Sequence, residues 1–189
     1  MKNILLSVLS FLLAASSAWA CSCVEDKNLS EEHKIANSYT RASLVIVGRV
    51  VKAEPVRVID SVRTKSSFSG LDTIYTSARE QIRYTFAVSK LLKGKVAATS
   101  LVTIMSAAQS AACGVNFKTG MEYLVYAYTV DQSPGPGGTP QKTTPYYATG
   151  LCERHQELRA VKSAELRQLR RIARKASGEH KFEWFELLD

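Results

Sequence analysis

Two cysteines separated by one residue, Cys21 and Cys23, directly follow a segment with the features of an export signal. Lys2 gives this segment a basic start, residues 4–15 are apolar except for serines, and the Ala-Trp-Ala sequence at 18–20 offers the small residues that signal peptidase accepts. The apolar run is shorter than the roughly 20 residues that a membrane span needs. Cleavage after residue 20 would therefore make a cysteine, with a free α-amine, the first residue of the mature chain.

An alternative processing route is lipoprotein maturation, in which Cys21 would itself be acylated and could not form a disulfide. Trp19 argues against this route, because small residues are wanted beside a lipidated cysteine. We therefore expect a secreted, periplasmic or extracellular protein with no transmembrane segment after signal cleavage. The short Met-Lys-Asn start favours a bacterial producer.

All four cysteines lie in the mature chain, namely Cys21, Cys23, Cys113 and Cys152. An even count behind an export signal predicts two disulfides. A bond between Cys21 and Cys23 would close a strained ring, so two pairings remain, and each ties the N-terminus to two distant points. A zinc site made by these thiols is disfavoured, because no pair has the Cys-x-x-Cys spacing and export exposes thiols to oxidation.

The length of the mature chain, 169 of the 189 residues, suits one domain with an appended helix. We expect a signal peptide at 1–20, a barrel domain at 21–152, and a C-terminal amphipathic helix with a docked tail at 153–189. The formal net charge is +8, or +7 without Lys2 of the signal. This balance favours acidic partners or anionic surfaces.

Five segments of the mature chain have the pattern of β-strands, and they are residues 43–52, 81–88, 100–105, 122–130 and 143–149. Gly48 indicates a bulge or a bend in the first of these strands. The second alternates, which places its apolar residues on one face: Ile82, Tyr84, Phe86 and Val88. Five short strands with helical ends predict a mainly β fold, a small five-stranded barrel of the OB type.

The segments between these strands carry weaker signals. Asn28, with a glutamate three residues later, predicts the cap of a short helix over 31–39. Residues 53–79 form a long connection, parts of which could extend a hairpin, and long connections often carry function. Residues 133–140 are too rich in proline and glycine for regular structure.

The C-terminal region has a helical pattern from Glu153 to Ala176, with Gly178 as its terminator and an apolar tail at 182–188. One side of this helix is an apolar stripe with a period of about 3.6 residues, formed by Leu158, Val161, Leu169, Ile172 and Ala176. The opposite side of this helix is basic, which suits either a solvated surface or contact with an anionic surface, and its arginines are Arg159, Arg167, Arg170, Arg171 and Arg174.

Motifs for catalysis or for a resident cofactor are not evident in the sequence. It has no paired acid and base, no phosphate loop and no nucleophile elbow, so we expect neither an enzyme nor a cofactor of its own. The scattered His33, His155 and His180 are predicted to be surface residues, and export argues against nucleic acid as a partner. The strand tyrosines are predicted to pack the barrel, and they are Tyr123, Tyr126 and Tyr128.

The order of several motifs resembles the N-terminal inhibitory domain of the tissue inhibitors of metalloproteinases. The matching features are the Cys21-Ser22-Cys23-Val24 start, the strand at 44–50, Leu-Lys-Gly at 92–94, Cys113-Gly114-Val115, Glu-Tyr-Leu-Val-Tyr at 122–126, and Cys152. The resemblance implies a netrin-like OB barrel. It also implies disulfides from Cys21 to Cys113 and from Cys23 to Cys152.

By the same resemblance, the α-amine and carbonyl of Cys21 would bind the catalytic zinc of a target metalloendopeptidase and displace its water. Ser22 would enter the specificity pocket, Cys23 and Val24 would continue an inhibitory ridge, and the loop at 113–115 would lie alongside. An α-amine with a pKa of roughly 7.7–8.0 loses its proton at little cost near neutral pH.

The chain also departs from that family. It has no cysteines for a third disulfide, two acidic residues replace a proline soon after Cys23, and the cysteine-rich second domain is absent. The alternative function is therefore a non-inhibitory netrin-like binding module of the cell envelope or extracellular space, in which the disulfides only staple the barrel.

Overall fold

The computed structural model describes Cys21, Cys23 and residues 27–65, 72–97, 99–109, 112–134 and 139–176. The predicted signal peptide, Ser22, Val24, Gly178 and the predicted docked tail at 182–188 lie outside the described residues. The described elements, in chain order, are α2 (Glu31–Arg41), β1 (Leu44–Lys65), β2 (Asp72–Lys93), β3 (Leu101–Ala107), β4 (Glu122–Pro134), β5 (Pro140–Ala148), β6 (Gln156–Glu157), the 3-10 helix η3 (Leu158–Ala160) and α3 (Ser163–Ala176).

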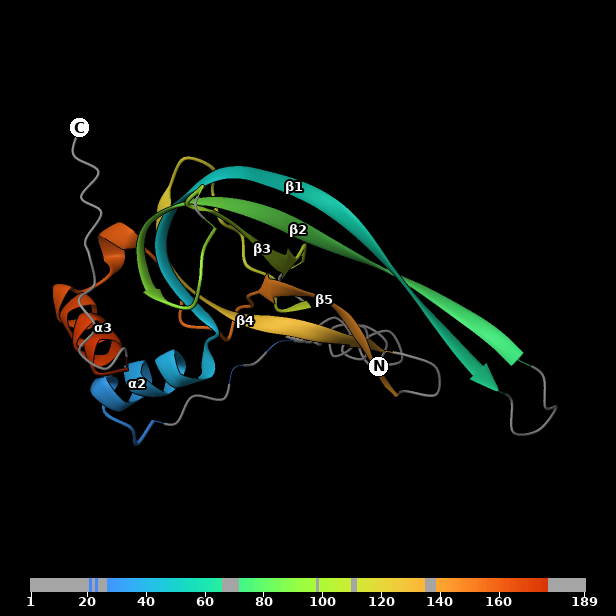
Figure 1. Ribbon diagram of the computed structural model, residues 1–189, viewed down its shortest axis with the longest axis horizontal. Coiled ribbons are helices and arrows are strands. Elements are labelled where there is room, and N and C mark those ends of the chain that lie inside the picture. Colours follow the sequence, from blue (N-terminus) through green and yellow to red (C-terminus); the bar gives the residue numbers. More distant parts are fainter. Residues whose placement is uncertain are drawn as a thin grey trace, which may run out of the picture.

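The strands form a closed ring, as predicted. In the part of the chain that the structure describes, five strands follow the order β1-β2-β3-β5-β4, β4 pairs back to β1, and the two-residue β6 adds to β4. The β3–β5 pairing is parallel, and the others are antiparallel. Figure 1 shows α2 and α3 together at one end of the molecule, while β1 and β2 extend beyond the barrel at the other. The predicted mainly β fold with a five-stranded barrel is confirmed.

Inside the ring, an aromatic cluster centres on Phe117. Its ring packs edge-on against Tyr84, Phe86 and Tyr123, with centroids 5.1, 5.3 and 4.8 Å away. The predicted alternation in β2 is confirmed, because Tyr84 and Phe86 are buried and Ile82 and Val88 pack against the same core. Edge-to-face aromatic pairs stabilise beyond their buried area by about 0.5–1.5 kcal/mol each.

A second core lies between the outer face of the barrel and the helices. Val45 and Val47 of β1 and Tyr126 of β4 pack there with Ile35 of α2 and Leu169 of α3. The inner faces of the same strands line the first core, so β1 and β4 are covered on both sides. This double coverage explains why the start of β1 is continuously apolar instead of alternating.

The strands are longer than the sequence predicts. The β1–β2 ladder continues from the barrel out to Lys65↔Asp72, so most of the predicted connection at 53–79 is a two-stranded ribbon. A register shift between Val47 and Gly48 confirms an irregularity at the predicted position, although the extra residue, Ser89, lies on β2 and not on β1. Strands β4 and β5 pair as far as Pro134↔Pro140, so the prediction that all of 133–140 is irregular is wrong at both ends.

The helix boundaries also correct the sequence analysis. Ser30, not Asn28, is the N-cap of α2, and its hydroxyl accepts a hydrogen bond from the backbone N–H of His33. Helix α3 begins at Ser163 and not at Glu153, because the residues between them form a turn, β6 and η3. Among the described residues, no helix is long and apolar enough to cross a membrane.

Candidate functional site: the anchored N-terminus

Two disulfides fasten Cys21 and Cys23 to the barrel. Cys21 is bonded to Cys113 and Cys23 to Cys152, with Cα–Cα distances of 5.5 and 5.2 Å. The pairing that the family resemblance implies is therefore confirmed, and these thiols do not form a zinc site. Cys21 is half-buried and Cys23 is exposed, so the anchored segment lies at the surface.

The loop that holds Cys21 is itself fixed to the barrel wall. Cys113 adopts a left-handed backbone, with φ of 59°. The N–H of Gly114 donates to the carbonyl of Gln109 at 3.0 Å, and the N–H of Val115 donates to the buried hydroxyl of Ser106 at 2.9 Å. The side chain of Val115 belongs to the barrel core. Cys113 is thus attached to β3 and to the core within two residues.

Gly114 is required by a close approach of two backbones. A Cβ at this position would lie 2.0 Å from the carbonyl oxygen of Ala107 and 2.8 Å from that of Gln109. Both neighbours are backbone atoms, which cannot rotate away as a side chain would. The loop therefore lies against the end of β3 at a distance that only glycine permits.

The turn that carries Cys152 lies against the Cys113 loop. Leu151 donates its N–H to the carbonyl of Cys113 at 2.8 Å. Thr149, at the start of the turn, donates its hydroxyl to the carbonyl of Tyr126 at 2.8 Å and its N–H to that of Met105 at 2.9 Å. The two disulfide-bearing segments are consequently neighbours, and both are held by barrel strands.

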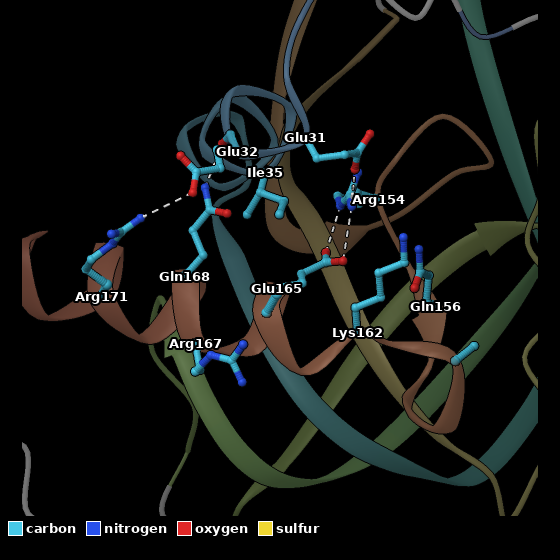
Figure 2. A pocket seen from close by; sticks show the side chains of 12 residues that line it. Glu31, Glu32, Ile35, Arg154, Gln156, Lys162, Glu165, Arg167, Gln168 and Arg171 are labelled. Atoms are coloured by element: carbon cyan, nitrogen blue, oxygen red, sulfur yellow. Dashed lines mark hydrogen bonds and ion pairs between the residues drawn. The ribbon is translucent and has the colours of Figure 1, made fainter.

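A charged cluster connects this turn to both helices (Figure 2). Arg154 donates from Nε to Oε1 of Glu165 at 2.7 Å and from Nη2 to Oε2 of Glu165 at 3.0 Å. The same Nη2 also reaches Oε2 of Glu31 at 3.0 Å. Glu165 is only 4 % exposed, and the hydroxyl of Tyr126 donates to its Oε1 at 3.4 Å. The cluster borders a hollow of about 750 Å³ between α2 and α3.

The pKa values follow from these contacts. Hydrogen bonding to Arg154 lowers the pKa of Glu31, and the hydrogen bond to Glu165 raises the pKa of Arg154. Burial, reinforced by the charge of Glu165, raises the pKa of Tyr126 well above its usual range. Near neutral pH, Arg154 therefore stays charged and the Tyr126 hydroxyl keeps its proton.

His155 is half-buried, so the prediction of a surface histidine is only partly right. Its ring packs edge-on against Phe117 at 5.5 Å, and among the described residues its buried Nδ1 has no hydrogen-bond partner. Burial lowers the pKa of His155 more than the backbone of Glu153 raises it. His33 is exposed at the start of α2, as predicted, and His180 lies outside the described residues.

The predicted ridge is only partly within the described residues. The described residues of the ridge lie together around the two disulfides, and they are Cys21, Cys23, Cys113, Gly114 and Val115. The side chain of Val115, however, points into the core. Ser22 and Val24 are not described.

The predicted arginine face divides between two elements. Arg167, Arg171 and Arg174 are exposed on α3, and Arg170 is half-buried there. Arg159 lies on η3 and pairs with Glu157. Arg171 lies 3.9 Å from Glu32 across the two helices.

Sequence reasoning missed the pair of Arg154 and Glu165. A usable signal was present, because Glu165 lies four residues before Leu169 on the apolar face of α3, where a carboxylate needs a partner. The partner itself could not be found, since Arg154 belongs to a turn outside the helix.

The fold and the site define a small β-barrel whose N-terminal cysteines are anchored to its wall by disulfides. The sequence profile of the tissue inhibitor of metalloproteinase family matches residues 19–134, more than half of the chain, and the chain belongs to this family. The matched region includes Cys21, Cys23 and Cys113, and it ends in β4. A search of curated proteins returns no match.

Proposed function

We propose that the mature protein is secreted and inhibits a zinc metalloendopeptidase, whose catalytic zinc binds the α-amine nitrogen and carbonyl oxygen of Cys21. Family membership supports the inhibitory class, and the disulfides are in keeping with export. The observation that carries the proposal is the bond from Cys21 to Cys113, a residue fixed to the barrel within two positions on its C-terminal side.

The physical argument is preorganisation. A catalytic zinc keeps one coordination position open for water, and a bidentate ligand from the inhibitor can take that position. A flexible terminus would lose conformational entropy on binding, whereas one already fixed by two disulfides loses little. In this proposal Ser22 enters the specificity pocket, Cys23 and Val24 continue the ridge, and the loop at 113–115 lies alongside.

The proposal is tested with protein whose N-terminus has been shown by mass spectrometry to be Cys21. We expect stoichiometric inhibition of one or more zinc endopeptidases in a panel and no inhibition of serine endopeptidases. A panel without any inhibited zinc enzyme, or equal inhibition of both classes, would contradict the proposal.

The second candidate is a non-inhibitory netrin-like module that binds an anionic surface. Its support is the exposure of Arg167 and Arg171 on α3. Salt-sensitive binding to anionic vesicles or polysaccharide, lost in the double variant Arg167→Gln/Arg171→Gln, would favour this function. Binding unaffected by that variant would exclude this surface.

A further inference from the structure

The attachments of the N-terminal segment converge on one turn, residues 149–154. Cys152 holds Cys23 by the disulfide, and Leu151 holds the backbone of Cys113, which is bonded to Cys21. Farther along the chain, the Arg154 side chain holds Glu31 at the start of α2. Cys21, Cys23 and Glu31 are therefore all fastened to this turn, directly or through Cys113.

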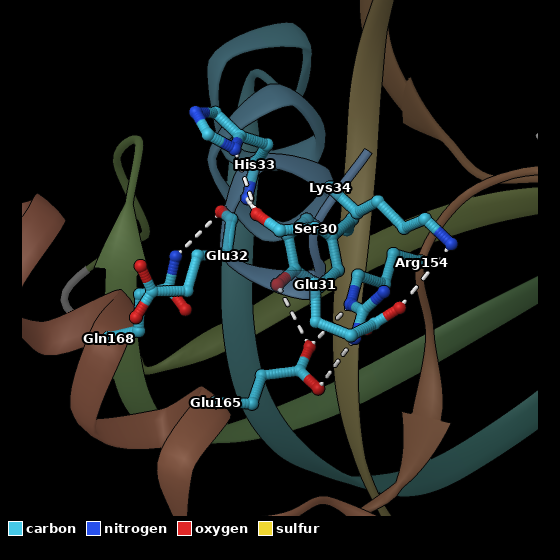
Figure 3. Close-up of polar contacts among 9 residues, drawn as sticks. Ser30, Glu31, Glu32, His33, Lys34, Arg154, Glu165 and Gln168 are labelled. Atoms are coloured by element: carbon cyan, nitrogen blue, oxygen red, sulfur yellow. Dashed lines mark hydrogen bonds and ion pairs between the residues drawn. The ribbon is translucent and has the colours of Figure 1, made fainter. Parts of the chain in front are cut away.

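Helix α3 holds this turn in place. Arg154 makes a bidentate contact with Glu165, the kind of charge-assisted pair that fixes geometry as well as contributing energy. Figure 3 shows the Arg154 guanidinium lying between the two carboxylates, one from each helix. Glu165 cannot easily move, because it is buried and Leu169, one helical turn farther on, is fully buried in the second core.

Helix α3 thus contacts Arg154 of the turn and the start of α2, although it is far from Cys21 and Cys23 in sequence. It lies beyond the region that matches the family, so that match gives it no role. Gln168 of α3 also donates to the backbone carbonyl of Glu32 at 2.7 Å, which fixes α2 against α3. The two helices and the turn therefore form one connected unit around Arg154.

We propose that Arg154 and Glu165 are positioning residues for the inhibitory N-terminus: α3 holds the 149–154 turn, and the turn holds the cysteine-anchored segment in its binding geometry. The expected loss of inhibition rests on the proposed function, whereas the expected increase in the mobility of the segment does not. The segment moves more freely when the bidentate contact is lost, and binding to a zinc site then costs more conformational entropy.

The test compares three variants. Glu165→Gln removes the charge and nearly preserves the shape, while Arg154→Lys keeps the positive charge but cannot bridge both carboxylates with a planar fork. Arg154→Lys provides a second test if Glu165→Gln fails to fold, because the buried carboxylate of Glu165 still has a positively charged partner in this variant. Glu32→Gln is the matched control, because it removes an exposed ion pair, to Arg171, from the same helix pair.

Two readouts separate positioning from general stability. The first is the 15N order parameter of the Cys23 amide, with the Phe86 amide of the core as reference, at a temperature where every variant is folded. We expect the Cys23 value in Glu165→Gln and Arg154→Lys to fall from the rigid range of about 0.85 toward the flexible range below about 0.6, with Phe86 unchanged. The second is the inhibition constant, which we expect to rise about tenfold in both variants and not in Glu32→Gln.

An unchanged Cys23 order parameter in both site variants, or an equal fall in Glu32→Gln, would overturn the inference. If the wild-type protein inhibits no protease, the proposed function fails, and the order parameter alone still decides whether Arg154 and Glu165 position the segment.

Discussion

The backbone N–H of Leu151 donates to the carbonyl oxygen of Cys113 at 2.8 Å, which places the two disulfide-bearing segments side by side. The bonds themselves span 92 and 129 residues of sequence, yet they attach to neighbouring points on the barrel. Cys21 and Cys23 are consequently held against a single region of the surface.

Removing the second disulfide tests how much the anchor contributes. In Cys23→Ser/Cys152→Ser, we expect the free energy of unfolding to fall by about 2–5 kcal/mol, because a long loop of the unfolded chain is no longer closed. Cys21 stays bonded to Cys113, so any inhibition should weaken and not vanish. Urea denaturation and inhibition assays measure the two effects. Unfolding at the same urea concentration as wild type would refute the predicted contribution.

Substitution of Gly114 tests the close approach of the Cys113 loop to β3. Gly114→Ala places a methyl group against the backbone oxygens of Ala107 and Gln109, so the loop must shift, at a cost of about 1–3 kcal/mol. Gly120→Ala is the control, because a Cβ there meets nothing within 4 Å and the cost is only that of its positive φ, about 1 kcal/mol. In thermal denaturation, the melting temperature of Gly114→Ala should be lower than that of Gly120→Ala. The reverse order would show that the loop accommodates a side chain.

His155 makes stability depend on pH. Because burial lowers its pKa in the folded protein, the unfolded chain binds its proton first as the pH falls. The stabilising contribution is complete well above the unfolded pKa of about 6.5, and it is lost as the pH falls through that value toward the lower folded pKa. When the pH is lowered from 8 to 5, we expect the free energy of unfolding to fall less in His155→Phe than in the wild type. Parallel urea titrations at both pH values check this, and identical losses would mean that His155 is not the responsible group.

Much of the fold follows from local patterns in the sequence. The alternation at Tyr84 and Phe86 predicts the inner face of β2, and the apolar spacing around Leu169 predicts the face that α3 buries. The family resemblance adds the disulfide pairing, which cysteine spacing alone leaves open between two choices. Each of these features could be predicted because the residues that determine it belong to one strand, one helix or one short sequence motif.

The missed features depend on pairing between distant residues. The outer part of the β1–β2 ribbon is held by backbone pairing such as Val58↔Arg79, so it needs no strong apolar pattern. The contact of Arg154 with Glu165 joins a turn to a helix, and neither residue is unusual in its own neighbourhood except for the carboxylate on an apolar face. The burial of His155 against Phe117 likewise arises only after the barrel has closed.

The central claim is that the free α-amine of Cys21 binds the zinc of a target protease. The most direct measurement compares the inhibition constant of protein that begins at Cys21 with that of protein carrying one extra alanine before it. The extension converts the amine into a peptide nitrogen, which is a poor metal ligand, and leaves the cysteines and their bonding partners in place. We predict that the extended protein, with the same melting temperature, loses nearly all inhibition. Equal inhibition by the two forms would contradict the mechanism.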